Sequence, residues 1–446
     1  MGDRVSGAWW CEHAWVDGRV ADGVLVTTTD GVIDAVDTDR APTGTCLQGL
    51  VIPGLANAHS HAFHRALRAH TQRGGGSFWT WREAMYRIAD RLTPQSYLEL
   101  ARAVYTEMAS AGITAVGEFH YLHHGPGGVP YADPNEMGRA LISAAADAGV
   151  RLTLLDTCYL TAGPAGEPLD GPQLRFGDGD ADRWAQRADA LRSATEDEPH
   201  VFVGAAVHSV RAVPAEQLAR VASWAQAYDA PLHVHSSEQV AEVEQCLAVY
   251  GCTPTALLRE HGVLGTRTTA VHATHLTRQD IADMRATSTG TCFCPTTERD
   301  LGDGIGPAPA LLEGPGPFSL GTDSHAMIDL LEEARAVELD ERLAGRRRGT
   351  IPAARLLDAA TVGGQQALGW TTAGRLEPGA RADLVAVDLA SVRTAGGGAT
   401  AENVVFAASA ADITDVVVDG RTVVTDRRHR LDAGRALAEI IGEMWS

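Results

Sequence analysis

The chain contains no lysine, so all 37 of its basic residues are arginines. A lysine carbamate bridging two metal ions, a Schiff base and a lysine general base are therefore excluded. Acidic residues outnumber the arginines and leave a net charge of −20, which argues against nucleic acid or an anionic membrane as a partner. An anionic small molecule would have to be bound by local arginines.

Cysteine is also scarce, with seven residues and no CxxC pair. Neither a disulfide framework nor a thiolate zinc site is indicated, and the CFC run at residues 292–294 suits small buried side chains. No apolar stretch approaches the roughly 20 residues of a membrane span. Residues 1–6 lack the basic start and apolar stretch of a signal peptide. We therefore expect a cytoplasmic protein.

Strand-like and amphipathic segments alternate through the middle of the chain. The expected strands are residues 50–58, 114–121, 151–159, 200–208, 231–235, 268–272, 289–295 and 318–323. Helical periodicity marks residues 94–111, 134–148, 215–228, 278–285 and 329–343. This pattern predicts an α/β fold, a (β/α)8 TIM barrel whose active site lies at the carboxyl ends of the strands.

Both ends of the chain contain short β-like pieces separated by turns. Residues 416–424 read as two strands around an Asp-Gly turn. We expect residues 1–52 and 374–446 to form a small β-sandwich domain, with the barrel in residues 53–373. Three glycines at 74–76 are either a lid hinge or an ordinary loop in the connection after the first barrel strand.

Metal-binding side chains occur at the ends of three expected strands. His59 and His61 are two positions apart, so both imidazoles can face one ion. The fifth strand offers His233 or His235, of which His235 lies nearer the carboxyl end, and the eighth strand ends at Asp323. Three imidazoles, a carboxylate and a water suit one zinc ion, Zn2+, and would also accommodate Fe2+ or Mn2+.

Proton carriers accompany these ligands. Glu238, three residues after His235, can carry a proton to a departing nitrogen. His272 ends the sixth strand and can orient or polarise a water on the metal. Asp323 would serve both as ligand and as proton acceptor. Hydrolytic deamination is the chemistry that this set favours.

The chain resembles the amidohydrolase superfamily over essentially its whole length. The resemblance rests on PGLANAHSH at residues 53–61, TDS at 322–324 and GRLEPGARADL at 374–384. Members without a bridging lysine resemble the mononuclear aminohydrolase branch, in agreement with the absence of lysine here. Superfamily relatives are often dimers, so a homodimer is an expectation from the resemblance alone.

Further segments are similar to formimidoylglutamate deiminases, which hydrolyse N-formimidoyl-L-glutamate to N-formyl-L-glutamate and ammonia in histidine degradation. These segments are HAFHRA (61–66), FWTWREAMY (78–86), EFHYLHH (118–124), VHSVRA (207–212), VHATH (271–275) and TTERDLGDG (296–304). The resemblance implies that Arg82, Tyr121, His208 and Arg211 surround the glutamate part of the substrate. Arginines suit such a dicarboxylate because they form bidentate ion pairs.

One position departs from that family. Some members carry glutamine where this chain has His64, and that amide contacts the α-carboxylate of the substrate. Histidine retains a hydrogen-bond donor, so the substrate class is still expected while the recognition pattern changes.

Two other functions compete with this prediction. Another mononuclear deaminase would act on a guanine- or pterin-like ring, for which stacking aromatics and amide hydrogen bonds are expected in place of paired arginines. A catalytically silent scaffold would have lost ligands or proton carriers, yet every one of them is present in the sequence.

Overall fold

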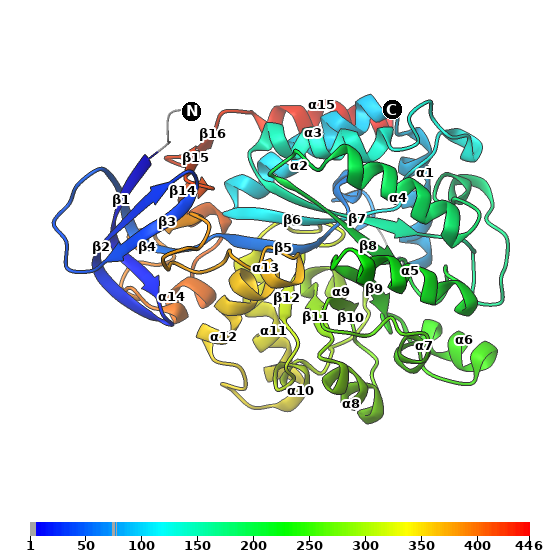
Figure 1. The fold of residues 1–446 in the computed structure, drawn as a ribbon. Coiled ribbons are helices and arrows are strands. Elements are labelled where there is room, and N and C mark those ends of the chain that lie inside the picture. Colours follow the sequence, from blue (N-terminus) through cyan, green and yellow to red (C-terminus); the bar gives the residue numbers. More distant parts are fainter. Residues whose placement is uncertain (1–5, 74–75, 77) are drawn as a thin grey trace.

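The computed structural model describes residues 6–73, 76 and 78–446, and it contains two eight-stranded sheets (Figure 1). Gly74 and Gly75 lie outside the described residues, so the lid hinge stays a prediction. One sheet is parallel and runs in chain order from β5 to β12. Its strands are β5 (Leu55–Ser60), β6 (Ile113–His120), β7 (Arg151–Cys158), β8 (Val201–Val207), β9 (Leu232–Ser236), β10 (Thr268–His272), β11 (Gly290–Phe293) and β12 (Phe318–Leu320).

A bridge between Ser60 and Asp323 joins the first strand of this sheet to the segment that follows its last strand. The sheet is thereby nearly closed into a barrel, which confirms the predicted (β/α)8 class. Strands β5 to β7 are buried at every position, as expected for parallel strands covered on both faces.

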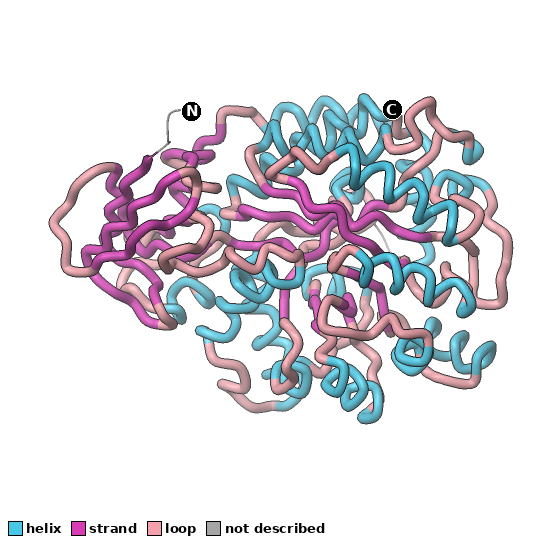
Figure 2. Tube along the Cα trace, viewed as in Figure 1, coloured by secondary structure: helices cyan, strands magenta, loops and turns pink. Residues whose placement is uncertain are grey.

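Helices surround the barrel strands, as Figure 2 shows. Thr93 begins α2 with a capping box, and its side chain accepts a hydrogen bond from the backbone N–H of Ser96 at 3.2 Å. The helices are α1 (Phe78–Arg91), α2 (Pro94–Ser110), α3 (Glu136–Ala148), α4 (Ala181–Ala194), α5 (Ala215–Ala227), α6 (Val240–Tyr250), α7 (Pro254–Glu260), α8 (Arg278–Thr287), α9 (Pro295–Leu301), α10 (Ala308–Leu312), α11 (Leu330–Gly345), α12 (Ala353–Asp358) and α13 (Gly364–Ala367). Shorter turns are η1 (Ala62–Leu67), η2 (Pro126–Gly128), η3 (Gly171–Arg175) and η4 (Ala359–Gly363).

The other sheet, which forms the small domain and is therefore termed the small sheet, is mixed and is built from both ends of the chain, as predicted. In order across the sheet its strands are β16 (Arg428–His429), β15 (Arg421–Thr425), β14 (Ile413–Val418), β13 (Leu384–Val387), β4 (Thr45–Pro53), β1 (Ser6–Val16), β2 (Arg19–Thr29) and β3 (Val32–Asp37). The predicted hairpin is present: β14 and β15 pair across Asp419 and Gly420, whose φ angles of 47° and 69° suit a tight hairpin turn. Later elements include α14 (Ala401–Phe406), η5 (Ala410–Asp412) and α15 (Ala433–Trp445), which packs on α2.

The strand expected at residues 50–58 is divided in the structure. Its first part belongs to β4 of the small sheet and its second part to β5 of the barrel, with the break at Gly54. A Cβ atom at Gly54 would lie 2.3 Å from the Thr114 hydroxyl and 2.7 Å from the Cβ of Asp383. An unbroken apolar pattern conceals such a change of sheet because both parts are buried. The domain limits at residues 52/53 and 373/374 remain a prediction.

The small sheet packs against the amino ends of the barrel strands, away from their carboxyl ends. Arg151, at the start of β7 and wholly buried, forms ion pairs with Asp383 and Asp419 of the small domain. Its Nη1 lies 2.9 Å from a carboxylate oxygen of each partner. Asp383 belongs to the 374–384 segment, so that segment has a structural role at the domain junction. Removing one partner would leave a buried charge uncompensated.

Among the described residues, no helix combines the length and the apolar character that crossing a membrane requires.

Candidate metal centre and substrate cavity

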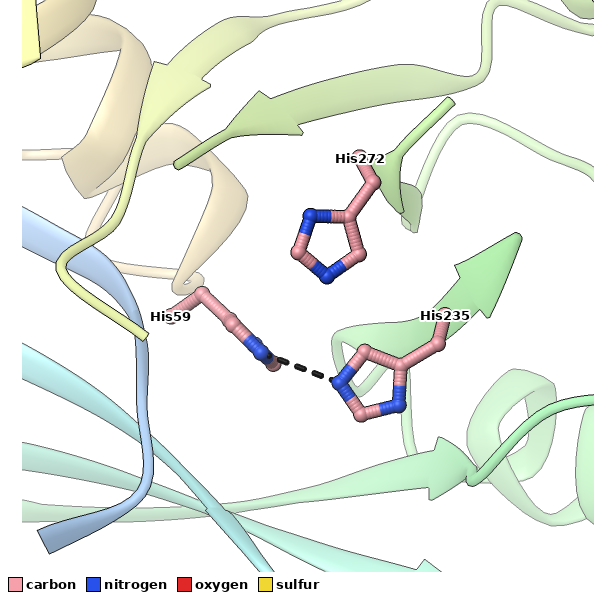
Figure 3. A group of neighbouring side chains, drawn as sticks. All are labelled: His59, His235 and His272. Atoms are coloured by element: carbon pink, nitrogen blue, oxygen red, sulfur yellow. Dashed lines mark hydrogen bonds between the residues drawn. The ribbon is translucent and has the colours of Figure 1, made fainter. Parts of the chain in front are cut away.

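The four predicted ligands converge beyond the carboxyl ends of the barrel strands. The Nε2 of His59 lies 3.4 Å from Oδ1 of Asp323, and the Nε2 of His61 lies 3.3 Å from the same oxygen. The Nε2 atoms of His59 and His235 are 3.0 Å apart (Figure 3). Zinc bonds of about 2.0 to 2.1 Å in a tetrahedron separate neighbouring ligand atoms by roughly 3.3 Å. These three spacings suit a zinc-sized ion, and His59 is common to two candidate metal-binding groups, one with His61 and Asp323 and one with His235 and His272.

The tautomers of two ligand imidazoles follow from their backbone contacts. The Nδ1 of His61 lies 2.9 Å from the carbonyl oxygen of Phe119, and the Nδ1 of His235 lies 2.9 Å from that of His208. A carbonyl only accepts hydrogen bonds, so Nδ1 carries the proton and Nε2 keeps its lone pair. Burial lowers the pKa of His61 to about 3 and that of His235 well below its ordinary value. Both rings are thus neutral, as metal binding requires.

His233, the alternative on the fifth strand, lies elsewhere. Its Nε2 is 3.0 Å from the carbonyl oxygen of Ala367 in α13, and it belongs to none of the metal-binding groups found among the described residues. The structure therefore places His235, and not His233, beside His59.

The first strand of the barrel sheet meets the segment after its last strand between residues 57–60 and 321–325, and this seam fixes the relative positions of the predicted ligands. The backbone N–H of Asp323 donates to the carbonyl of His59 at 3.0 Å. Asn57 and Thr322 exchange two hydrogen bonds of 2.7 and 2.9 Å. Gly321 permits this approach, because a Cβ there would lie 2.8 Å from the carbonyl oxygen of His59.

A buried carboxylate supports the same segment from the second strand. Glu118 accepts hydrogen bonds of 2.7 Å from the hydroxyl of Ser60 and from the backbone N–H of Ala62, which flank His61. Burial raises the pKa of Glu118 to about 7. The Ser60 hydroxyl also lies 3.2 Å from Nε2 of His325, whose Nδ1 is 2.9 Å from the Thr322 hydroxyl. The two sides of the seam are thereby linked through side chains.

Several residues at these strand tips have strained backbone conformations. Ser237, His272, Ala273, Asp323 and His325 all have positive φ, between 40° and 68°. Each such conformation costs about 1 to 3 kcal/mol in a residue other than glycine and persists where the surroundings enforce it. The clustering of these costs is typical of a functional site.

His272 faces the predicted ligands through its Nε2, and Glu298 contacts the Nδ1 side of its ring. Its Nε2 lies 3.8 Å from Oδ2 of Asp323 and its Nδ1 lies 3.2 Å from Oε1 of Glu298. A carboxylate at Nδ1 selects the tautomer whose Nε2 points toward the cavity, so Glu298 orients this ring. Burial disfavours the charged ring, but the charge of Glu238 and the hydrogen bond to Glu298 outweigh it and raise the pKa of His272.

Glu238 lies between His272 and Arg211. Its Oε1 is 4.0 Å from Nε2 of His272, and its Oε2 is 3.5 Å from Nη2 of Arg211. The backbone N–H of Glu238 donates to Glu242 at 3.1 Å. Burial opposes the charge on Arg211, but the carboxylates of Glu242 and Glu238 outweigh that cost and raise its pKa.

A cavity of about 650 Å³, including its opening, lies over the cluster. Every predicted site residue except His59 lines it, and His59 lies beneath, among the ligands. Aromatic side chains make up much of the remaining wall. Its lining includes His61, His64, Trp81, Arg82, Tyr86, Tyr121, Tyr159, Phe176, His208, Arg211, His235, Glu238, His272 and Asp323.

Two predicted substrate contacts are directly paired. The Nε2 of His64 lies 2.9 Å from the hydroxyl of Tyr121, whereas its Nδ1 has no hydrogen-bond partner among the described residues. Burial lowers the pKa of His64 and raises that of Tyr121, so the imidazole is neutral and the phenol keeps its proton. The pair can then offer one hydrogen bond to an anion: from Nδ1–H of His64 when Tyr121 donates to Nε2, or from the Tyr121 hydroxyl when Nε2–H donates to it.

Arg82 lies on helix α1, in the connection that follows the first barrel strand. The Nε of Arg82 donates to the hydroxyl of Tyr86 at 2.5 Å, and its guanidinium lies 5.6 Å from the centre of the Trp79 ring. Aromatic residues have modest helix propensity, so the sequence FWTWR after a glycine run conceals this helix. The expected shielding of Arg82 by aromatic side chains is present.

Sequence reasoning missed the positioning carboxylates Glu118, Glu242 and Glu298. Glu298 belongs to the quoted segment 296–304 and follows the seventh strand by one helical turn, which is a detectable signal. Glu242 lies one helical turn after Glu238 on α6. Glu118 begins the quoted segment 118–124, but its place in a wholly buried strand does not reveal which groups it contacts.

A barrel with histidines and an aspartate gathered at the carboxyl ends of its strands is typical of a class of hydrolases, and the comparison with known families agrees. The model of the amidohydrolase family matches residues 50–423. The chain therefore belongs to the amidohydrolase family, as the sequence resemblance predicted.

Individual relatives sharpen this assignment. The chain is 39% identical over 435 residues to the formimidoylglutamate deiminase of Pseudomonas aeruginosa, with 94% of each chain covered. The crystal structure of an amidohydrolase from Brucella melitensis superposes with a TM-score of 0.92 at 34% identity, covering 99% of this chain and 100% of that one. Atrazine chlorohydrolase from Arthrobacter aurescens, crystallised with zinc, gives a TM-score of 0.87 at 25% identity, covering 98% and 99%.

Proposed function

We propose that this enzyme is a zinc-dependent deiminase that converts N-formimidoyl-L-glutamate to N-formyl-L-glutamate and ammonia, a step of histidine degradation. The observation that carries the proposal is the composition of one cavity. Its lining combines three predicted metal ligands, two proton carriers and two arginines, and the fourth predicted ligand, His59, lies against these ligands. The similarity to the Pseudomonas deiminase supports the same reaction.

The substrate has two carboxylates, and the cavity offers a set of partners for each. Arg82 and Arg211 are the cationic groups in its lining and suit the side-chain carboxylate. Tyr121, His208 and His64 are neighbouring donors that suit the α-carboxylate. Partial burial strengthens these ion pairs relative to water, which allows an acidic protein to bind a dianion.

The formimidoyl carbon would then lie over the metal ligands. Zinc, when held by His59, His61, His235 and Asp323, supplies the Lewis acidity that lowers the pKa of a water toward neutrality. His272 hydrogen-bonds the water and orients it, and Asp323 accepts the proton that the water loses as it attacks the formimidoyl carbon. Both protons of the water pass in turn to the terminal nitrogen, with Glu238 delivering the proton to the departing nitrogen, and the carbon–nitrogen bond breaks so that ammonia leaves. The oxygen of the water remains as the formyl oxygen.

A second candidate function is deamination of a guanine- or pterin-like ring. The aromatic lining favours it, because Trp81, Tyr86, Tyr159 and Phe176 could pack against a planar base. The two guanidinium groups in the lining favour a dicarboxylate instead, since arginine binds carboxylates through bidentate ion pairs. The cytoplasmic location and the homodimer stay predictions.

The two functions are separated by reaction in ¹⁸O-labelled water with zinc-loaded protein. We expect N-formyl-L-glutamate carrying one ¹⁸O atom, with ammonia in equal amount, as detected by mass spectrometry. Conversion of guanine to xanthine, with no product from the formimidoyl compound, would instead support the ring deaminase.

A further inference from the structure

A buried thiol beside the metal ligands has no role in the proposed reaction. Cys294 follows β11, and its Sγ forms a group with ligand atoms of His272 and Asp323 in which all atoms lie within 4.8 Å of one another. All three residues are buried. Thiolate, imidazole and carboxylate are the side-chain groups that bind zinc in proteins.

The three residues come from the ends of adjacent strands. Strand β10 pairs with β11, and β11 pairs with β12, which leads to Asp323. The intervening Gly321 leaves room for the thiol, because a Cβ there would lie 2.9 Å from Sγ of Cys294. The group is thus built on rigid neighbouring elements, as a metal site requires.

Negative charge surrounds this group. Carboxylate oxygens of Glu238 and Glu298 lie 4.0 and 3.2 Å from the two ring nitrogens of His272. Burial, reinforced by the charge of Glu238, raises the pKa of nearby Asp303 to about 9. The carboxylates of Glu238 and Glu298 beside His272 favour an additional cation in this group.

The geometry points to a second divalent-cation site formed by His272, Cys294 and Asp323, which zinc fills at concentrations above those that fill the first site. This inference rests on the proposed metal centre, because Asp323 belongs to both sites. The second site offers three protein ligands and shares Asp323 with the first, which has four, so a cation binds more weakly there. A cation on His272 also prevents that ring from orienting the water, so excess zinc inhibits the enzyme.

Metal stoichiometry tests the site directly. Wild-type protein and the variants Cys294→Ala and Cys292→Ala are dialysed against increasing zinc, and bound metal is measured by mass spectrometry. Cys292 is a matched control, since it is buried two residues earlier and belongs to none of the metal-binding groups among the described residues. We expect two ions per chain in wild type and Cys292→Ala, and one in Cys294→Ala. Exposed Cys46 is retained in all three proteins, so adventitious thiol binding cancels.

Cobalt provides a second readout that is independent of activity. The second equivalent of Co2+ should produce a sulfur-to-cobalt charge-transfer band in wild type and Cys292→Ala, and no such band in Cys294→Ala. Circular dichroism verifies folding, and Cys294→Ser serves as the milder variant if the alanine variant is unfolded. Zinc in excess should inhibit wild type several-fold and leave the Cys294 variants unaffected.

The outcomes separate this inference from the proposed function. Wild-type protein that holds one ion at every zinc concentration overturns the second site and leaves the first intact. Two ions in Cys294→Ala overturn the assignment of the thiol. Wild-type protein that binds no zinc overturns the proposed metal centre, and the second site with it.

Discussion

Oε2 of Glu238 lies 3.5 Å from Nη2 of Arg211, so the proposed proton carrier is paired with a proposed substrate-binding cation. Glu242 supports both residues, through the backbone of Glu238 and through its charge on Arg211. A substrate carboxylate that binds Arg211 competes with Glu238 for the same guanidinium. Substrate binding and the position of the proton carrier are therefore coupled.

Replacing Arg211 with lysine should raise KM for N-formimidoyl-L-glutamate by roughly 30- to 100-fold, because a bidentate ion pair is lost. The coupling predicts that kcat falls as well, since Glu238 loses its partner. Steady-state kinetics measure both constants, with zinc content as the control. An Arg211→Lys variant with both constants unchanged would show that this arginine does not contact the substrate.

Replacing Glu238 with glutamine should preserve zinc binding and reduce kcat by about a hundredfold or more, the usual effect of losing a general acid. The side chain keeps its size and can still contact Arg211, so KM should change little. Single-turnover ammonia release is the measurement. Near-normal turnover in Glu238→Gln would refute the role of Glu238 as the proton carrier.

Replacing Glu298 with glutamine should reduce kcat by roughly 10- to 100-fold, because the amide no longer enforces the tautomer of His272. Zinc affinity should be unchanged, since His272 is not among the four proposed ligands of the first ion. Chelator competition and kinetics distinguish the two effects. Equal loss of zinc affinity would instead place His272 among those ligands.

Glu118 predicts a pH dependence of stability. Its pKa is about 7 in the folded protein against an ordinary value of 4.5, so the folded state binds its proton more tightly. The corresponding stability is fully present below about pH 4.5 and is lost as the pH rises through 7. The Glu118→Gln variant does not lose this stability, because the amide has no proton to release. Its free energy of unfolding relative to wild type should therefore rise by about 2 to 3 kcal/mol from pH 4.5 to pH 7. Urea unfolding at several pH values measures the difference, and a constant difference would contradict the assignment.

Much of the fold and of the candidate site could be predicted because the informative residues lie at strand ends. In a parallel barrel all carboxyl ends meet at one face, so His59, His235 and Asp323 needed no distance information to be grouped. The choice of His235 over His233 followed from the same rule, and the structure places His235 in the cluster.

Other features depend on contacts that spacing does not encode. Glu118 supports the segment around His61 through its contacts with Ser60 and Ala62. Its strand is buried at every position, so the burial pattern does not reveal these contacts. The division of the first predicted strand at Gly54 follows from the close approach of Thr114 and Asp383, which are distant in sequence. Helix α1 was not predicted, because the aromatic residues at its start have only modest helix propensity.

The central claim is tested most directly by ammonia release from zinc-loaded protein given N-formimidoyl-L-glutamate, N-formimidoyl-L-aspartate or guanine in parallel. We predict efficient release from the glutamate compound, which can reach both arginines and the proton carriers at once, and none from guanine. Silence toward the glutamate compound, from protein that holds about one zinc ion per chain, would contradict the proposed substrate.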